Sequence, residues 1–132
     1  MDLGLPGKRA LVTGSSAGIG AAIAEELAAE GVSVVVHGRD PVRTKAVAEL
    51  ISKRGGHAGV AVGDLTTEAG SAATVAAVVK TMGGIDILVN NVVSRLGQPT
   101  YLADLVCFIA SPRSDFMTGS TIRTNGGATP TV

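Results

Sequence analysis

Short apolar runs alternate along the chain with longer segments in which apolar residues recur at helical spacing. The run Arg9–Thr13 is largely apolar, ends at a glycine and is typical of a buried strand. In residues 18–30, Ile19, Ile23 and Leu27 fall four residues apart, which is typical of one face of a helix. The same pattern predicts strands at 9–13, 32–37, 57–62 and 85–89, and helices at 18–30, 41–54 and 68–81.

This alternation of strand and helix predicts a parallel α/β sheet. After Asn91 the pattern is interrupted by a loop, and a further helix at 101–111 and a final strand at 120–124 follow. We expect one Rossmann-like, doubly wound domain spanning residues 1–132, shortened to about five strands in the order 3-2-1-4-5. Right-handed crossovers place the helix at 101–111 on the same sheet face as the helix at 68–81.

Composition and charge narrow the classes of protein that this pattern allows. Apolar residues make up 45% of the chain and aromatic residues only 2%, so small aliphatic side chains must build the core. The 11 basic and 11 acidic residues balance without forming runs, which argues against a nucleic-acid partner or an anionic membrane. The sequence has no signal peptide and no membrane-spanning stretch, and Cys107 is its single cysteine, so we expect a cytoplasmic protein. His37 and His57 lack the spacing of metal ligands, and no metal site is expected.

The strongest local signal is Thr13–Gly20 (TGSSAGIG), a glycine-rich turn between a predicted strand and a predicted helix. Gly14 permits a sharp turn, Gly18 lets the backbone approach a diphosphate, and Gly20 allows helix and strand to pack closely. The N-terminus of the helix at 18–30 then presents N–H groups and a positive dipole end to that diphosphate. A tight strand-to-helix turn without any ligand is the alternative interpretation.

Two charged residues beyond this turn bear on the choice of nucleotide. Arg39 follows the second strand, where an acidic residue usually meets a cofactor without a 2′-phosphate, so an arginine there favours NADP over NAD. Asp64 follows the third strand and is placed to accept a hydrogen bond from the adenine amino group. The alternatives are a solvated arginine next to Asp40, and an aspartate that forms a turn before Leu65 and Thr66.

The combination of motifs resembles the short-chain dehydrogenase/reductase family, in particular its members similar to 3-oxoacyl-acyl-carrier-protein reductase. TGSSAGIG, then GR, DLT and GGIDILVNN after successive strands carry the resemblance in residues 1–91, the family's N-terminal half. RLGQP, LADLVCFIASP and MTGSTIRTNGG in residues 95–127 are similar to the family's last helix and strand. The resemblance implies NAD(P)-dependent oxidoreduction of carbonyls and alcohols. It also implies a cofactor held by Gly14, Ser15, Ser16, Gly18, Ile19, Gly20, Arg39, Asp64, Leu65, Asn90 and Asn91.

One departure from the family limits the chemistry that this chain can perform. Between the two matching parts, family members carry a Ser, a Tyr-x-x-x-Lys pair and an Asn, and the Lys lowers the pKa of the Tyr that acts as general acid/base. The sole tyrosine here is Tyr101, and four residues later stands Leu105 rather than a lysine. Val92 and Val93 replace the small residues that usually follow the Asn-Asn pair, beside the expected nucleotide path. We therefore expect no catalytic residues in this chain.

Three functions stay open on the sequence alone. The first is a module that binds NADP(H) or another adenine nucleotide without turnover. The second is a structural or interaction protein with a vestigial site, and the third is a working oxidoreductase whose catalytic segment is not part of this sequence; we rank them in that order. We also expect a homo-oligomer whose contact lies in residues 101–124, because the final strand offers an unpaired edge.

Overall fold

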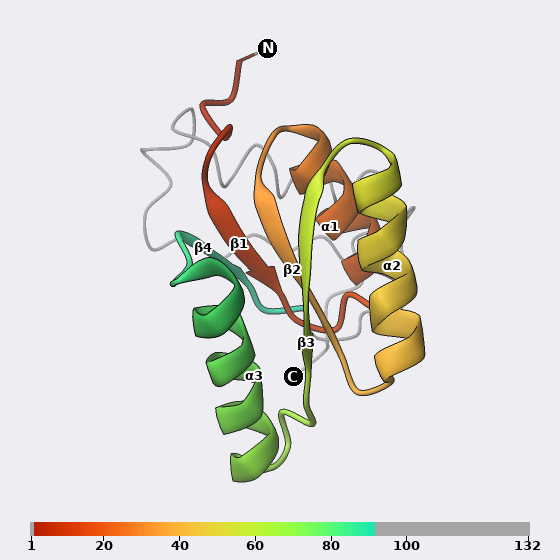
Figure 1. Ribbon diagram of the computed structural model, residues 1–132, viewed down its shortest axis with the longest axis vertical. Coiled ribbons are helices and arrows are strands. Elements are labelled where there is room, and N and C mark those ends of the chain that lie inside the picture. The colour runs from red at the N-terminus through yellow and green to blue at the C-terminus, as the bar shows by residue number, and fades with distance from the viewer. Residues whose placement is uncertain (1, 92–132) are drawn as a thin grey trace, which may run out of the picture.

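The computed structural model describes residues 2–91, which form a parallel sheet with helices on both faces (Figure 1). Strands and helices alternate strictly, as the apolar pattern predicts. Strands that follow one another in the chain are joined by helical crossovers, the kind of connection that parallel strands require. In chain order the elements are β1 (Arg9–Val12), α1 (Gly18–Ala29), β2 (Ser33–Gly38), α2 (Pro41–Lys53), β3 (His57–Val62), α3 (Glu68–Met82) and β4 (Ile87–Val89).

The sheet order within these residues is β3-β2-β1-β4. β1 pairs in parallel with both β2 and β4, so that Val12 lies opposite Val36 on one side and Val89 on the other. The chain first builds outward from β1 to β3 and then returns to add β4 on the other side, which confirms the predicted doubly wound fold and puts its switch point between β1 and β4. The predicted strand at 120–124 and helix at 101–111 lie outside the described residues.

The two central strands bury apolar side chains on both of their faces. Val12 and Val34 belong to a larger core cluster that includes the buried sides of α1 and α2. Leu11 and Val35 point the other way and pack with Val78 of α3 in a smaller cluster. Because successive strand residues alternate between faces, α1 and α2 cover one face and α3 the other (Figure 1). Burial on both faces is the reason that these strands read as continuous apolar runs.

Polar side chains fix where two of the helices begin. The carboxylate of Asp40 accepts a hydrogen bond from the backbone N–H of Val42 at 2.9 Å and caps α2. The hydroxyl of Thr67 accepts one from the N–H of Gly70 at 3.0 Å and caps α3. Helix α1 differs, because its N-cap residue is Ala17 and no side chain caps it.

The start of β4 corrects the sequence-based prediction, which put it at residue 85. β4 begins two residues later, at Ile87, because Asp86 makes contacts of its own. The backbone N–H of Asp86 donates to the carbonyl of Arg9 at 2.8 Å, and its carboxylate accepts from the Arg9 N–H at 2.9 Å. The ends of the other elements agree with prediction to within one residue.

Several large apolar side chains stay exposed on the surface. Val75 and Val79 on the outer side of α3 are 61% and 55% exposed, and Leu88 of β4 is 59% exposed. Among residues 2–91, no helix combines the length and the apolar character that crossing a membrane requires.

Candidate functional site

The predicted site residues gather at one edge of the sheet. In a parallel sheet the carboxyl ends of all strands lie at the same edge, where open α/β sheets bind their ligands. The glycine-rich loop follows β1, Arg39 follows β2, Asp64 and Leu65 follow β3, and Asn90 and Asn91 follow β4. The fold therefore brings together the four segments that the sequence singled out.

Glycines are required in the loop after β1 for two different reasons. Gly14 and Gly18 have φ angles of 61° and 58°, in the left-handed region that other residues rarely adopt. Gly20 instead has no room for a side chain, because a Cβ there would collide with the carbonyl of Gly14 and lie 2.8 Å from Nδ2 of Asn91. The Asn91 amide donates to that same Gly14 carbonyl at 3.2 Å. The loop is therefore closed tightly between the start of α1 and the end of β4.

Ser15 ties the loop to both central strands. Its side chain is completely buried, its hydroxyl donates to the carbonyl of Val12 at 2.7 Å and the same oxygen accepts from the N–H of His37 at 2.9 Å. The backbone N–H of Ser15 donates to the carbonyl of His37 at 2.8 Å. The Ser15 side chain thus points into the protein and fixes the loop on β1 and β2, so it is not exposed to a ligand.

Two residues outside the predicted set of cofactor-binding residues, His37 and Thr13, also hold the loop. His37, only 4% exposed, accepts a hydrogen bond at Nδ1 from the N–H of Gly14 (3.1 Å), and its Nε2 lies 2.9 Å from the carbonyl oxygen of Gly63. The Thr13 hydroxyl accepts from the N–H of Asn91 at 2.9 Å and lies 3.2 Å from Oδ1 of Asn90. The only sequence signal for His37 is a polar side chain directly after three valines of the same strand.

The N-terminus of α1 is open to an anion. Its N-cap residue, Ala17, has no hydrogen-bonding side chain, and the first turn holds no acidic residue. The first backbone N–H groups of any helix lack intrahelical partners, and the helix dipole adds partial positive charge there. A Cβ built at Gly18 would meet nothing within 4 Å, so the backbone is accessible at this point. The arrangement suits a phosphate or diphosphate group.

Arg39 carries a guanidinium that no group within residues 2–91 holds by a hydrogen bond or ion pair. The carboxylate of the neighbouring Asp40 caps α2 and lies 3.8 Å from Nε of Arg43. Ser16 packs on Gly38, where a Cβ would come within 2.7 Å of the Ser16 hydroxyl oxygen. The Ser16 hydroxyl therefore lies against the residue that precedes Arg39.

Asp64 forms a turn directly after β3. Its Oδ1 accepts hydrogen bonds from the hydroxyl of Thr66 at 2.6 Å and from the Thr66 N–H at 2.9 Å. These two bonds, the hydroxyl's first, hold the pKa of the Asp64 carboxyl below its ordinary value, and the charge of Arg39 acts in the same direction. Oδ1 of Asp64 thus forms the turn that the alternative interpretation of this residue predicts. Leu65, the next residue, is 42% exposed.

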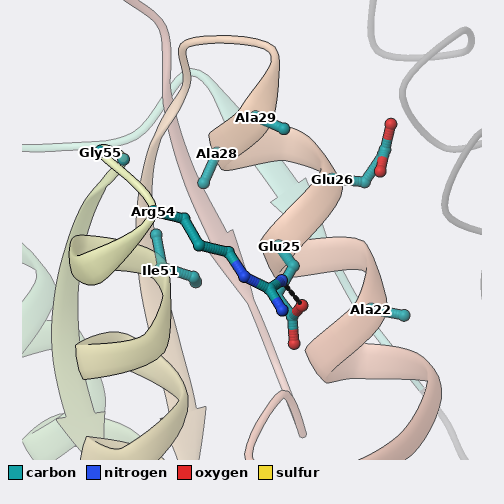
Figure 2. A pocket seen from close by; sticks show the side chains of 9 residues that line it. Ala22, Glu25, Glu26, Ala28, Ala29, Ile51, Arg54 and Gly55 are labelled. Atoms are coloured by element: carbon teal, nitrogen blue, oxygen red, sulfur yellow. Dashed lines mark hydrogen bonds and ion pairs between the residues drawn. The ribbon is translucent and has the colours of Figure 1, made fainter.

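A groove of about 400 Å³ lies elsewhere, between the C-terminal halves of α1 and α2 (Figure 2). Figure 2 shows the side chain of Arg54 reaching across it to an ion pair with Glu25. Its walls are mainly alanine side chains, Ile51 and two glycines, and it contains none of the predicted site residues. No cluster of metal-ligating side chains occurs in the part of the chain that the structure describes. The carboxyl edge of the sheet is therefore the better candidate.

A parallel sheet in this order, with a glycine-rich loop between its first strand and first helix, defines the Rossmann-like class of α/β folds. The chain belongs to the short-chain dehydrogenase/reductase family, because a sequence model of that family, described as short chain dehydrogenase, matches residues 8–105. This match confirms the resemblance carried by the motifs.

Curated relatives agree with this membership and are much longer than this chain. Glucose 1-dehydrogenase of Gluconobacter oxydans is 41% identical over 95 residues, which are 71% of this chain and 36% of that protein. The 3-oxoacyl-acyl-carrier-protein reductase FabG of Aquifex aeolicus is 46% identical over 94 residues, or 69% of this chain and 37% of that protein. The chain thus spans little more than a third of the length of these relatives.

Similar solved structures include complexes with a nicotinamide cofactor. L-sorbose reductase from Gluconobacter frateurii, complexed with NADPH and L-sorbose, matches with a TM-score of 0.68 and 32% identity over 84% of this chain and 48% of its own. A metagenomic short-chain oxidoreductase in complex with NADP matches with a TM-score of 0.61 and 38% identity over 80% of this chain and 49% of its own. The family is thus one in which NADP(H) is bound by members of similar fold.

Proposed function

We propose that this chain binds NADP(H) at the carboxyl edge of its sheet and does not by itself reduce carbonyls. The observation that carries the proposal is the loop Thr13–Gly20. Internal contacts hold it closed on Gly20 and Asn91, and the N-terminus of α1 beside it lacks a side-chain cap. NADPH and NADP in two structures of similar fold support the choice of ligand.

The phosphate groups of the nucleotide would lie on the first turn of α1. The backbone N–H groups of Gly18, Ile19 and Gly20 would bind the diphosphate, together with the positive end of the helix dipole. Arg39 would pair with the 2′-phosphate, and the Ser16 hydroxyl, which lies against Gly38, would donate to the same group. This set of donors favours NADP over NAD.

The adenosine end would lie between the loops that follow β3 and β4. Asp64 would accept a hydrogen bond from the adenine amino group, and the half-exposed Leu65 would pack against the ring. Asn90 and Asn91 would face the ribose side, where the Asn91 amide already holds the carbonyl of Gly14. The buried Ser15 would contribute by fixing the loop.

The chemistry that NADPH supplies when bound is a hydride for a carbonyl carbon. The chain's own residues lack the partner group for this step, since no lysine follows Tyr101 at the fourth position. A tyrosine with its ordinary pKa near 10 is a poor proton donor at neutral pH without a nearby cation. We therefore propose a nucleotide-binding role without turnover for this chain.

The test combines calorimetric titration of the protein with NADPH and a steady-state assay of NADPH oxidation with a panel of ketones and quinones. A complete short-chain reductase in the same assay is the positive control. We expect saturable binding and no oxidation above background. Turnover of about 1 s⁻¹ or faster, the ordinary range of enzymes, would contradict the catalytic part of the proposal. Absence of binding would contradict the whole proposal and favour a vestigial site.

We extend the proposal to the setting and assembly of the chain. A single cysteine, Cys107, has no partner for an internal disulfide and fits a reducing, cytoplasmic compartment. Residues 101–124, the predicted contact of a homo-oligomer, lie outside the described residues. Within the described residues, the exposed apolar side chains of α3 and β4 favour self-association.

A further inference from the structure

His37 connects three segments at the carboxyl edge of the sheet. It is the penultimate residue of β2, and its ring lies between the loop after β1 and the end of β3. Nδ1 is 3.1 Å from the backbone nitrogen of Gly14, and Nε2 is 2.9 Å from the carbonyl oxygen of Gly63. With 4% of its surface exposed, the ring exchanges hydrogen bonds with backbone groups rather than with bulk water.

These two partners allow only one protonation state of the ring. A backbone N–H can only donate, so Nδ1 must present a lone pair to Gly14. A carbonyl oxygen can only accept, so Nε2 must carry the proton toward Gly63. The bridge therefore requires the neutral imidazole with its proton on Nε2. A second proton on Nδ1 would point one N–H at another and break the bond to Gly14.

Gly14 is the residue on which the closure of the loop depends. It has a φ of 61°, its carbonyl accepts from the Asn91 amide, and Gly20 packs directly against that carbonyl. The N–H that binds His37 belongs to the peptide group directly before the one that carries this carbonyl. Loss of the bond to His37 would free this peptide to rotate and loosen the loop that leads to the N-terminus of α1.

We propose that His37 is a positioning residue whose neutral form holds the glycine-rich loop in its nucleotide-binding conformation, so that nucleotide affinity falls when His37 is protonated. The proposal rests on the proposed function, because it concerns the affinity of the same site. The sign follows from the bridge. Affinity is highest where the ring is neutral and decreases toward acid pH, because the added proton on Nδ1 breaks the bond to Gly14.

Charged and titratable side chains are present on every element that contacts β2, the strand that carries His37. The elements that contact β2 carry Arg9 on β1, Glu25 and Glu26 on α1, Arg43, Lys45, Glu49 and Lys53 on α2, His57 on β3, and Glu68 and Lys80 on α3, while Arg39, Asp40 and Asp64 lie in the loops after β2 and β3. Asp64, next to Gly63, stays ionised above pH 5.5 because Thr66 holds its pKa below the ordinary value. His57 is an exposed imidazole at the opposite end of β3 and serves as the control.

The experiment uses the full chain and three variants, with NADP⁺ titrated calorimetrically at several pH values between 5.5 and 8. His37→Gln keeps an amide oxygen and N–H for the bridge but has no titrating proton, His37→Phe removes the bridge, and His57→Gln removes the other imidazole. We expect the affinity of the wild type and of His57→Gln to fall toward pH 5.5 about fivefold to tenfold more than the affinity of His37→Gln does. This factor corresponds to the free energy of one net hydrogen bond. His37→Phe, where it folds, should bind weakly at every pH. Protonation of the nucleotide's own phosphate affects all variants equally. The same pH dependence of affinity in the wild type and in His37→Gln would therefore overturn the proposal.

A spectroscopic measurement separates this proposal from the proposed function. Nitrogen NMR of the nucleotide-free protein at pH 8 should show His37 protonated at Nε2 and not at Nδ1. The amide signals of Gly14 and Gly18 should shift with the titration of His37 in the wild type and stay constant in His37→Gln. If NADP⁺ fails to bind but these signals behave as expected, the proposed function fails and the positioning of the loop stands. Gly14 and Gly18 signals that ignore the His37 titration would overturn the role of His37.

Discussion

In the proposed site, we expect the guanidinium of Arg39 to set a preference for NADPH over NADH. It is exposed, and no hydrogen bond or ion pair within residues 2–91 restrains it. A charge-assisted contact of about 1.5–3 kcal/mol with the 2′-phosphate corresponds to a roughly tenfold to hundredfold preference. We expect Arg39→Ala to weaken NADPH binding by about this factor and to leave NADH binding almost unchanged, as measured by calorimetric titration.

Arg43 offers a matched control in the same segment. It is exposed as well, but its Nε lies 3.8 Å from the carboxylate of Asp40. Arg43→Ala should retain the preference for NADPH. Equal affinities for the two nucleotides in the wild type, or a preference that survives Arg39→Ala, would remove Arg39 from the site.

Single residues divide sharply into those that the sequence predicts and those that it does not. Gly14, Gly18 and Gly20 are predictable, because a short turn between strand and helix restricts their own backbones. The inward roles of Ser15 and His37 are not, because their partners come from strands far away in the sequence and exist only once the sheet has paired. Arg39 is predictable as a position, but only the structure shows that no hydrogen bond or ion pair within residues 2–91 holds its guanidinium.

The boundaries of helices and strands likewise divide into those that local sequence predicts and those that depend on distant residues. The start of α2 could be predicted, since Asp40 followed by Pro41 is a local capping signal. The start of β4 could not be predicted, because it depends on contacts between Asp86 and Arg9, which lies 77 residues earlier in the sequence. Asp86 binds Arg9 through backbone and side chain directly before the pairing of Ala10 with Ile87 begins.

The pair of Arg9 and Asp86 gives a prediction at this scale. The side-chain and backbone hydrogen bonds of Arg9 lower the pKa of the Asp86 carboxyl. A carboxyl with a lowered pKa in the folded state stabilises the fold above its ordinary pKa near 3.9, and this contribution disappears as the pH falls through the lowered value. Asp86→Asn should therefore lower the urea midpoint at pH 7, and the difference from wild type should shrink below about pH 4.

Glu49→Gln is the control for this prediction. Its carboxylate lies 3.8 Å from Nζ of Lys45 in an exposed pair one helical turn apart, so it should contribute little. A loss of stability in Asp86→Asn that stays constant down to pH 2, or one no larger than that of Glu49→Gln, would show that the ion pair does not fix β4 on β1.

At the scale of the whole molecule, the sheet order was predictable because few topologies satisfy strict alternation of strand and helix with right-handed crossovers. The fifth strand and last helix of the prediction fall on residues 101–124, outside the described part, and stay predictions. The lack of a Tyr-x-x-x-Lys pair needs no structure, since Tyr101 is the chain's only tyrosine. The geometry of the candidate site could not be predicted from the sequence, because its hydrogen-bond donors come from loops after different strands and meet only in the folded sheet.

Exposed apolar surface predicts the behaviour of the molecule in solution. Val75 and Val79 on α3 and Leu88 on β4 are each more than half exposed, and such surfaces favour self-association. Sedimentation velocity at high micromolar concentration should detect dimers or larger species. Val79→Lys should shift the distribution toward monomer, whereas Val42→Lys, at an exposed apolar position on α2, should not. A wild type that sediments as a uniform monomer would contradict this prediction.

The binding of NADPH by the glycine-rich loop is tested most directly by thermal melts of three proteins. Saturation at about 100 times the dissociation constant should stabilise the wild type by roughly 2.7 kcal/mol. Gly18→Val should lose this stabilisation, because a side chain there strains a φ of 58° and covers the open backbone beside α1. Gly55→Val is the matched control, since Gly55 has a φ of 89° and equally open surroundings far from the loop. It should melt earlier but still respond to NADPH. A wild type that NADPH fails to stabilise, or a Gly18→Val variant that it stabilises as much as the wild type, would show that the nucleotide does not bind at this loop.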